Sequence, residues 1–218
     1  MDAAERRAAM VERQLRRRGI TDERVLVAMG SVPRENFVPE RIRDRAYDDG
    51  ALAIGHEQTI SQPWVVAAIC QALRLEGGEN VLEIGTGSGY SAAVLAALAV
   101  RVHSIERIAA LAEEARQRLE ELEITNVEVI VGDGTRGHPD AAPYGGIAVH
   151  ATAPTAPRSL LDQLATGGRL VIPIAAGRAD MLTAFHKDEG GLRAETIGPC
   201  RFVPLIGAEG FDGDPETD

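Results

Sequence analysis

The sequence predicts an α/β fold in which a mostly parallel sheet is wound on both faces by helices. Three observations carry this prediction. Short apolar segments alternate with helical patterns over residues 79–174. A glycine-rich turn at residues 85–89 follows the first apolar segment. Two strand-like segments after Gly177 are joined by a short turn instead of a helix, which indicates an antiparallel C-terminal edge.

The residue pattern in the first third of the chain predicts a helical N-terminal extension. Residues 3–18 have the periodicity of a helix that Gly19 ends. We expect Thr21 to cap a second helix that ends at Gly30. Residues 36–38 lie between two prolines and are expected to be extended.

The α/β part follows in a regular order. Its expected parallel strands are residues 80–84, 101–105, 127–131, 146–149 and 169–174. Its expected helices are residues 90–98, 108–122 and 157–165. Residues 181–186 and 193–202 are expected to form the antiparallel hairpin, with its turn at residues 188–191. The expected units are a helical region at 1–78, a Rossmann-like domain at 79–209, and an acidic, disordered tail at 210–218.

The composition is typical of a cytoplasmic globular chain. The 218 residues are 44% hydrophobic and 26% charged, which is enough to bury a core. The longest apolar run, residues 92–100, is far below the ~20 residues of a membrane span, and the charged start does not resemble a secretory signal. Cys70 and Cys200 are too few for a disulfide framework. The net charge of −10 disfavours nucleic acid as a partner, and the basic cluster at 16–18 is interpreted as a solvated helix end.

The glycine-rich turn has the spacing Gly-x-Gly-x-Gly at Gly85, Gly87 and Gly89, unlike the dinucleotide-binding spacing. Glu83 precedes it, and a carboxylate suits a cationic ligand better than a diphosphate. This loop resembles that of class I methyltransferases, which use S-adenosylmethionine. The spacing also disfavours a nicotinamide dehydrogenase. Glu106 and Asp133 end the next two strands, where they could accept hydrogen bonds from a ribose and from an adenine amino group.

A second motif is far more specific. Residues 54–63 read Ile-Gly-His-Glu-Gln-Thr-Ile-Ser-Gln-Pro and resemble a segment of the protein-L-isoaspartate O-methyltransferases. Further segments that resemble this family in the same order are residues 10–15, 32–39, 82–90, 104–107, 132–134, 142–144, 167–169 and 201–207. The resemblance spans residues 5–210, with residues 201–207 matching the closing strand of the family.

The resemblance implies an activity and a set of site residues. It implies methyl transfer from S-adenosylmethionine, leaving S-adenosylhomocysteine, to the free α-carboxylate of L-isoaspartyl residues, with repair through a succinimide. The implied partners are isoaspartyl proteins and peptides, and we expect a monomer. Ser61 is the implied active-site residue, and Thr59 and His150 are further candidates on the substrate side. The implied cofactor-binding residues are Gln58, Thr59, Ile60, Gly85, Thr86, Gly87, Glu106, Arg107, Asp133 and Gly134. The resemblance implies that the first three line a loop over the cofactor and the substrate within the helical region at 1–78.

The chemistry requires no strong base, because a carboxylate is already ionised at neutral pH. A hydroxyl such as that of Ser61 could hold one carboxylate oxygen while the other attacks. Ser61 also precedes Pro63 near a helix start, so we expect it to serve as an N-cap as well. The histidines have no partners at zinc-ligand spacing, so no metal is expected. Trp64 could form a wall of the site or belong to the core, and we expect the core.

Four positions depart from the family pattern. Glu57 replaces a frequent glycine and adds charge beside the site. Gly145 replaces the usual aspartate at the start of a strand, where we expect a loss of stability more than of chemistry. His150 and Thr152 replace small residues at a strand end. His150 either narrows the substrate cleft and makes activity pH-dependent, or it is a packed strand-end histidine.

Two other functions stay open. A relative could methylate an Asp of one dedicated peptide, but such relatives usually carry additional C-terminal sequence. A non-catalytic cofactor-binding protein is also conceivable, although the presence of Ser61, Glu106 and Asp133 disfavours it.

Overall fold

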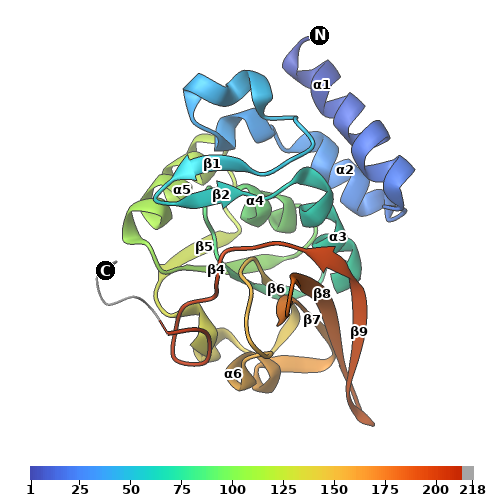
Figure 1. Cartoon of the computed structure of the whole chain (residues 1–218), viewed down its shortest axis with the longest axis vertical. Coiled ribbons are helices and arrows are strands. Elements are labelled where there is room, and N and C mark those ends of the chain that lie inside the picture. The colour runs from blue at the N-terminus through green and yellow to red at the C-terminus, as the bar shows by residue number, and fades with distance from the viewer. Residues whose placement is uncertain (213–218) are drawn as a thin grey trace.

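A seven-stranded sheet forms the centre of the molecule, which is described by a computed structural model over residues 1–212 (Figure 1). The strand order is β5-β4-β3-β6-β7-β8-β9, and the first five strands in this order are parallel. The parallel strands are β3 (Asn80–Ile84), β4 (Arg101–Glu106), β5 (Val127–Val131), β6 (Tyr144–Val149) and β7 (Leu164–Ala176). The strand order reverses between β3 and β6, and a ligand crevice forms at such a point in open α/β sheets.

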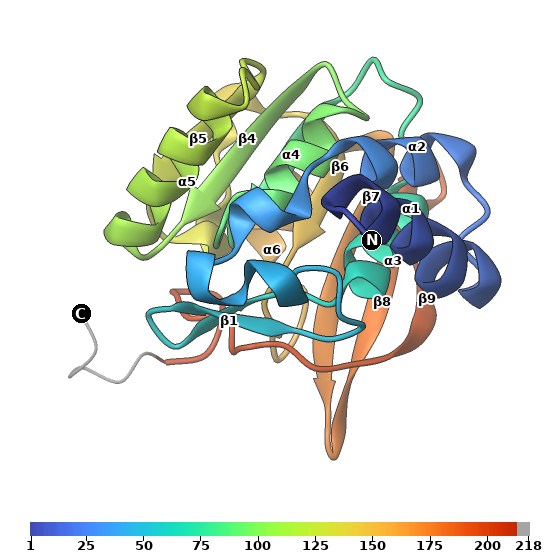
Figure 2. The ribbon, with the colours of Figure 1, turned by 90° about the horizontal axis from the view of Figure 1, so that it is seen from above.

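The antiparallel edge is formed by β8 (Ala179–Asp188) and β9 (Gly191–Cys200). Their ladder closes at the pair Asp188 and Gly191, so the turn has two residues. In two perpendicular views, this hairpin projects beyond the body of the molecule (Figures 1 and 2). The expected strand to Phe202 is too long, because β9 ends at Cys200 and the chain then leaves the sheet.

Helices cover both faces of the sheet unequally. One core cluster joins residues of α2 (Glu23–Ser31), α3 (Pro63–Leu73), α4 (Tyr90–Ala96) and α5 (Ala109–Glu121) to one face of the sheet. A second cluster joins α6 (Arg158–Asp162) to the other face. The adjacent residues Val81 and Leu82 belong to opposite clusters, as expected of a strand buried on both faces. The doubly wound α/β prediction is therefore confirmed, although α6 is shorter than expected because Leu164 already pairs with Tyr144.

The N-terminal extension is helical but differs in detail from the prediction. A continuous helical segment contains α1 (Ala3–Met10), the π-helix η1 (Val11–Leu15) and the 3-10 helix η2 (Arg16–Arg18). Gly19 ends it in the left-handed region, with φ 91°. The cap of α2 is Asp22, which accepts from the amides of Arg24 and Val25; the assignment to Thr21 was wrong. Gly30 lies inside α2, and residues 36–38 are not uniformly extended.

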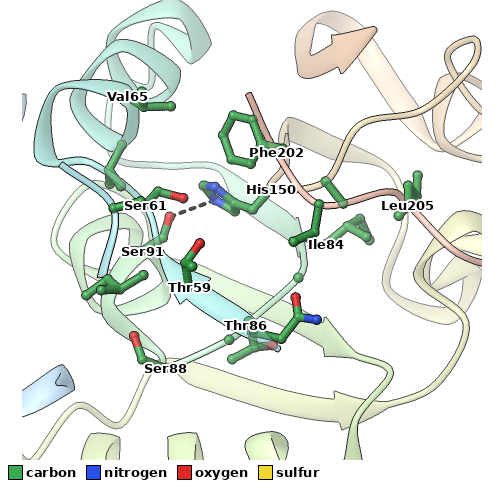
Figure 3. A pocket seen from close by; sticks show the side chains of 18 of the residues that line it. Thr59, Ser61, Val65, Ile84, Thr86, Ser88, Ser91, His150, Phe202 and Leu205 are labelled. Carbon is green, nitrogen blue, oxygen red and sulfur yellow. Dashed lines mark hydrogen bonds between the residues drawn. The ribbon is translucent and has the colours of Figure 1, made fainter. Parts of the chain in front are cut away.

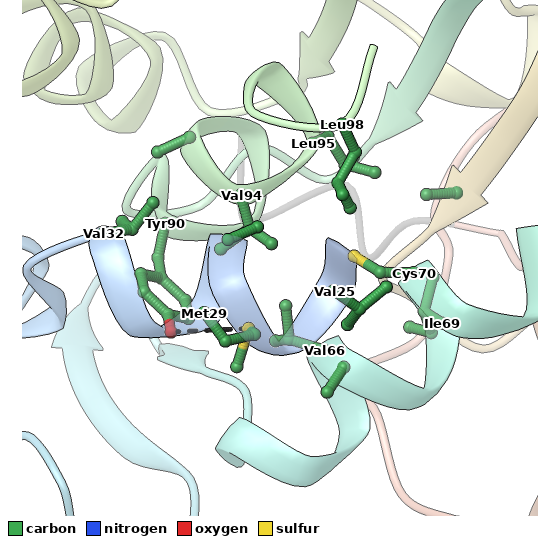
Figure 4. Packing of buried hydrophobic residues seen from close by; sticks show 14 of the residues in the cluster. Val25, Met29, Val32, Val66, Ile69, Cys70, Tyr90, Val94, Leu95 and Leu98 are labelled. Carbon is green, nitrogen blue, oxygen red and sulfur yellow. Dashed lines mark hydrogen bonds between the residues drawn. The ribbon is translucent and has the colours of Figure 1, made fainter. Parts of the chain in front are cut away.

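The 3-10 helices of this region are η3 (Arg34–Phe37) and η4 (Glu40–Arg45). Between β5 and β6 the chain forms η5 (Gly134–Arg136) and η6 (Pro139–Ala141). Figure 4 shows how the extension packs against the helices α3 and α4: Met29 of α2 lies beside both, and the Tyr90 hydroxyl of α4 lies 3.7 Å from its sulfur. The extension is therefore part of one continuous core.

A small antiparallel hairpin was missed by the sequence analysis, which placed a loop here. It consists of β1 (Leu52–Gly55) and β2 (Gln58–Ile60). Its turn residues, His56 and Glu57, have φ values of 50° and 56°. Such a turn usually contains glycine or asparagine, so the sequence carried no hairpin signal.

Gly145 fits its surroundings because it has no side chain. A Cβ there would lie 2.6 Å from Cγ and 2.8 Å from Cβ of Glu79. The Glu79 carboxylate accepts hydrogen bonds from the amides of Glu76 and Gly77, each at 2.8 Å. The expected loss of stability at Gly145 is therefore not supported by the packing.

The disordered tail expected at residues 210–218 was predicted to begin too early. The Phe211 amide donates to the Leu205 carbonyl at 2.7 Å, so the chain folds back on itself up to the end of the described residues. The rest of the predicted tail, residues 213–218, lies outside them. Both cysteines are free thiols, with Cys70 buried. Within residues 1–212 no helix has the length and apolar character needed to cross a bilayer.

Candidate active site

A cavity of about 970 Å³ opens at the carboxyl ends of the parallel strands, where the strand order reverses (Figure 3). Its walls come from the β1–β2 hairpin, the start of α3, the glycine-rich turn, the ends of β4 and β6, and residues 199–206. Segments distant in sequence therefore enclose one space, which is large enough for a nucleoside-sized cofactor and a peptide side chain.

The glycine-rich turn forms the cavity floor. Gly85, Gly87 and Gly89 have φ values of 90°, 53° and 90°, which favour glycine because it lacks a Cβ. The Gly85 amide donates to the Ile105 carbonyl at 2.8 Å. The buried Thr86 hydroxyl lies 2.6 Å from that of Ser104. The turn is thus fixed to β4, and its backbone lies against the cavity.

Glu106 lines the cavity at the end of β4. Its Oε2 accepts from the Gly87 amide at 2.8 Å, and its Oε1 accepts from the Ile108 amide at 3.0 Å. A carboxylate oxygen can accept more than one hydrogen bond, so both oxygens retain capacity for a ligand. The side chain therefore fixes the glycine turn and has acceptor capacity left on both oxygens, while its ribose role stays a prediction.

Glu83 does not reach the cavity, so the ligand role suggested by its sequence position was wrong. Its side chain is fully buried. The Ser104 hydroxyl donates to Oε2 at 2.5 Å, and Nε2 of His150 lies 3.3 Å from Oε1. The register of β3 against its two neighbours brings these groups together, which no local motif could reveal.

Asp133 lies behind the cavity wall, which its neighbour Gly134 lines. Its carboxylate accepts from the amide and hydroxyl of Thr135, at 2.9 and 2.6 Å, and from the Ala208 amide at 2.9 Å. Burial alone would raise the pKa of Asp133, but these hydrogen bonds hold it below its ordinary value. Asp133 therefore holds the segment after Leu205, and its adenine role stays a prediction.

Ser61 stands between β2 and α3 and lines the cavity. Its hydroxyl points toward the His150 ring (Figure 3). The N-cap of α3 is Gln62, without a side-chain hydrogen bond, so the cap role predicted for Ser61 was wrong. This leaves the Ser61 hydroxyl for the cavity.

Arg34 fixes the backbone of Ser61 by a hydrogen bond. It is fully buried, and its guanidinium donates to the carbonyls of Ser61 at 2.8 Å and Ala46 at 2.7 Å. Its Cζ lies 4.7 Å from the centre of the Tyr90 ring, which is a cation–π geometry. The N-terminal extension thereby fixes the catalytic candidate.

The cavity gathers all the predicted site residues except Asp133: Gln58, Thr59, Ile60, Ser61, Gly85, Thr86, Gly87, Glu106, Arg107, Gly134 and His150 line it. Thr152 is buried and donates to Asp180 at 2.8 Å. Trp64 packs against the main core cluster, as expected, and also lines the cavity. Its Nε1 donates to the Arg18 carbonyl at 3.1 Å.

Sequence reasoning also missed several lining residues, namely Arg18, Ser88, Ser91, Cys200, Arg201 and Phe202. Ser88 lies inside the glycine motif and Ser91 lies two residues after it, so the position of the motif after β3 was a usable signal. Arg201 and Phe202 belong to the segment 201–207 that resembles the family, which was a second usable signal. Arg18 reaches the cavity through tertiary packing, which has no local signature.

The fold and cavity together define a class of protein. Glycine backbone and a carboxylate lie at the ends of adjacent parallel strands, where they suit a nucleoside with a cationic chain. This is the arrangement of an α/β methyltransferase that uses S-adenosylmethionine, with Glu106 and the glycine turn as the residues that fit it.

The comparisons with known proteins give the family. The family model for protein-L-isoaspartate(D-aspartate) O-methyltransferase matches residues 5–210. Protein-L-isoaspartate O-methyltransferase 1 of Rhodopseudomonas palustris is 54% identical over 95% of this chain and 86% of its own. The corresponding protein 2 of Marinobacter nauticus is 52% identical over 96% of this chain and 97% of its own. The chain belongs to the protein-L-isoaspartate(D-aspartate) O-methyltransferase family.

Solved structures agree with this assignment. A protein-L-isoaspartate O-methyltransferase superposes with a TM-score of 0.84 at 30% identity, covering 95% of this chain and 67% of its own. A Plasmodium falciparum structure called a putative member of the family, in complex with S-adenosyl-L-homocysteine, gives a TM-score of 0.80 at 25% identity, covering 92% and 98%. The predictions of family, fold, methyltransferase activity and S-adenosylmethionine as cofactor are confirmed.

Proposed function

We propose that this chain starts the repair of damaged proteins by methylating the free α-carboxylate of L-isoaspartyl residues. The methyl ester then closes to a succinimide, which hydrolyses in part to normal aspartate. The observation that carries the proposal is the single cavity that joins the glycine turn and Glu106 to Ser61.

The proposed cofactor contacts follow from the cavity walls. Glu106 accepts hydrogen bonds from the ribose hydroxyls, and the turn around Gly85 and Gly87 lies along the aminoacyl part. Arg107 and Gly134 flank the nucleoside. Asp133 accepts from the adenine amino group with the carboxylate lone pairs that the amides of Thr135 and Ala208 leave unused. Gln58, Thr59 and Ile60 cover the cofactor from the β1–β2 hairpin.

The reaction itself needs alignment more than acid–base chemistry. A bound S-adenosylmethionine supplies a methyl group activated by its sulfonium. A substrate carboxylate would attack this carbon while the carbon–sulfur bond breaks and leaves its electron pair on sulfur, so no residue of this chain would have to move a proton. Ser61 donates to the second carboxylate oxygen, and Thr59 bounds the substrate side. Alignment and exclusion of water can supply several kcal/mol, as effective molarities indicate.

The proposed partners and location complete this function. The partners are isoaspartyl proteins and peptides, and the enzyme acts as a cytoplasmic monomer without nucleic acid or membrane contact. The acidic net charge of −10 supports the absence of nucleic acid.

The deciding experiment compares two peptides of the same sequence, one with L-isoaspartate and one with L-aspartate. Each is incubated with the enzyme and S-adenosylmethionine, and base-labile methanol is measured. Methylation of the isoaspartyl peptide alone is the expected result. Cofactor binding without methylation of either peptide would instead favour a dedicated peptide substrate or a non-catalytic protein.

A further inference from the structure

The last arginine of the basic cluster differs from the two before it. Arg16 pairs with Glu12 and Glu23, and all three side chains are exposed. Arg17 is also exposed and pairs with Glu12. Arg18 instead lines the cavity, with 41% of its side chain exposed. The interpretation of the cluster as a solvated helix end is therefore confirmed for the first two arginines, whereas Arg18 belongs to the cavity wall.

The Arg18 guanidinium is held in place by two side chains. Its Nη1 donates to both carboxylate oxygens of Asp49, at 3.0 and 2.9 Å. Its Cζ lies 5.4 Å from the centre of the Trp64 ring, which is a cation–π geometry. Nε2 of Gln62 donates to Oδ1 of Asp49 at 2.6 Å, so the same carboxylate connects the arginine to the residue that follows Ser61.

These contacts leave one edge of the guanidinium without a partner. Nε and Nη2 of Arg18 make no hydrogen bond or ion pair within the described part of the chain, because the bonds to Asp49 use Nη1 alone. The N–H groups of Nε and Nη2 project in parallel from a planar group, and such an edge can bind both oxygens of one carboxylate. Arg18 is therefore a fixed group with a bidentate donor edge still available.

This edge lies at the substrate side of the cavity. Trp64, which packs under the guanidinium, lines the cavity together with Val65 and Ser61. Figure 3 shows Val65 and Ser61 on the side of the cavity away from Thr86 of the glycine turn. The group that Arg18 binds is therefore expected to belong to the peptide and not to the cofactor.

We propose that Arg18 is a specificity residue whose free edge binds the carboxylate of an Asp or Glu side chain next to the isoaspartyl residue. This inference rests on the proposed function, to which it adds a preference for damaged sites in acidic sequences. Asp49 and Trp64 act through Arg18 and are positioning residues.

The other charges of the cavity wall are compatible with an acidic side chain. The described lining contains three arginines and three carboxylates: Arg18, Arg107, Arg201, Glu57, Glu106 and Asp212. Arg201 is the alternative binder, but it is exposed and makes no hydrogen bond or ion pair with the described residues. Arg18 is already ordered by Asp49, so it loses less side-chain entropy when a carboxylate binds.

The test compares isoaspartyl peptides that differ in a single flanking side chain. The peptide ends are acetylated and amidated, and Glu or Gln stands at one of the two positions on either side of the isoaspartate. With saturating S-adenosylmethionine, we expect Glu to raise kcat/KM about threefold to fivefold over Gln at one or more of these positions. Addition of about 0.5 M NaCl reduces this ratio, because salt screens an exposed ion pair.

Three variants assign the preference to one side chain. R18Q removes both the charge and the donor edge, so the Glu and Gln peptides become equivalent. R18K keeps the charge without the planar edge and retains only part of the ratio. R17Q is the matched control, because it makes the same change on an arginine that does not line the cavity, and it keeps the ratio of the unsubstituted enzyme. The ratio compares two peptides on one protein, so a loss of folded enzyme cancels from it.

The outcomes separate this inference from the proposed function. An enzyme that methylates the isoaspartyl peptides without a Glu preference at any position, or keeps the preference in R18Q, overturns the role of Arg18 alone. A preference that is lost in R201Q and kept in R18Q assigns the carboxylate to Arg201 and also overturns it. An unsubstituted enzyme that binds S-adenosylmethionine but methylates no isoaspartyl peptide overturns both.

Discussion

The Ser61 hydroxyl is positioned by its backbone, since Arg34 binds its carbonyl and the next residue, Gln62, is the N-cap of α3. We expect Ser61→Ala to lower kcat for the isoaspartyl peptide about 10- to 100-fold, because one donor to the carboxylate is lost. Cofactor affinity should stay within twofold. Single-turnover methyl transfer and calorimetry measure the two quantities separately. A large loss of cofactor affinity would show that Ser61 serves the cofactor and not the substrate carboxylate.

Glu106 combines a proposed ligand role with the support of the glycine turn. Glu106→Ala removes the acceptor of the Gly87 amide as well as that of the ribose hydroxyls. We expect cofactor affinity to fall at least tenfold, since hydrogen bonds to a charged group contribute about 1.5–3 kcal/mol. Calorimetric titration with S-adenosylhomocysteine measures it, and an unchanged Kd would contradict the ribose assignment.

At the scale of elements, the start of β6 packs against the turn that precedes β3. Gly145→Ala places a Cβ 2.6 Å from Cγ of Glu79, so the Glu79 side chain or the strand must move. We expect the free energy of unfolding to fall by about 1–3 kcal/mol, as for other overpacked sites. Gly198→Ala on β9 is the control, because no atom lies within 4 Å of its added Cβ. Urea denaturation compares the two variants, and equal unfolding free energies would show that the Glu79 side chain moves aside without a cost in stability.

The same scale separates what the sequence predicts from what it does not. The central strands were predictable because residues such as Val81 and Leu82 are buried on both faces and read as apolar runs. The β1–β2 hairpin was not, because its turn uses His56 and Glu57 at positive φ. Most of the site could be assigned from motifs, but the partners of Glu83 lie 21 and 67 positions away, at Ser104 and His150. Such contacts depend on strand register, which local patterns do not specify.

At the scale of the whole molecule, two carboxylates hold the C-terminal segment over the sheet. Glu209 accepts from the hydroxyl and the amide of Ser159, and Asp133 accepts from the Ala208 amide. The Ser159 hydroxyl, followed by its amide, lowers the pKa of Glu209 below its ordinary value. The same segment contributes Leu205 and Ile206 to the cavity, so its attachment links stability to cofactor binding.

The lowered pKa values of Glu209 and Asp133 predict a loss of stability in acid. A carboxyl group with a lower pKa in the folded than in the unfolded state stabilises the fold above its unfolded pKa, ~4.3 for Glu and ~3.9 for Asp. That contribution is lost as the pH falls through the folded value. We therefore expect the unfolding free energy to drop below pH ~5, with cofactor affinity dropping in parallel.

Glu209→Gln tests whether this attachment causes the effect. Its unfolding free energy should lie below that of the unsubstituted protein at pH 7 and approach it at low pH, because protonation has by then removed the same interaction. Urea denaturation between pH 3 and pH 8 gives the profile, and Glu120→Gln on the exposed side of α5 serves as the control. A constant difference between Glu209→Gln and the unsubstituted protein at all pH values would mean that the glutamate acts by packing. If the difference in unfolding free energy from the unsubstituted protein narrows at low pH for Glu209→Gln and not for Glu120→Gln, the charge of Glu209 holds the C-terminal segment over the cavity.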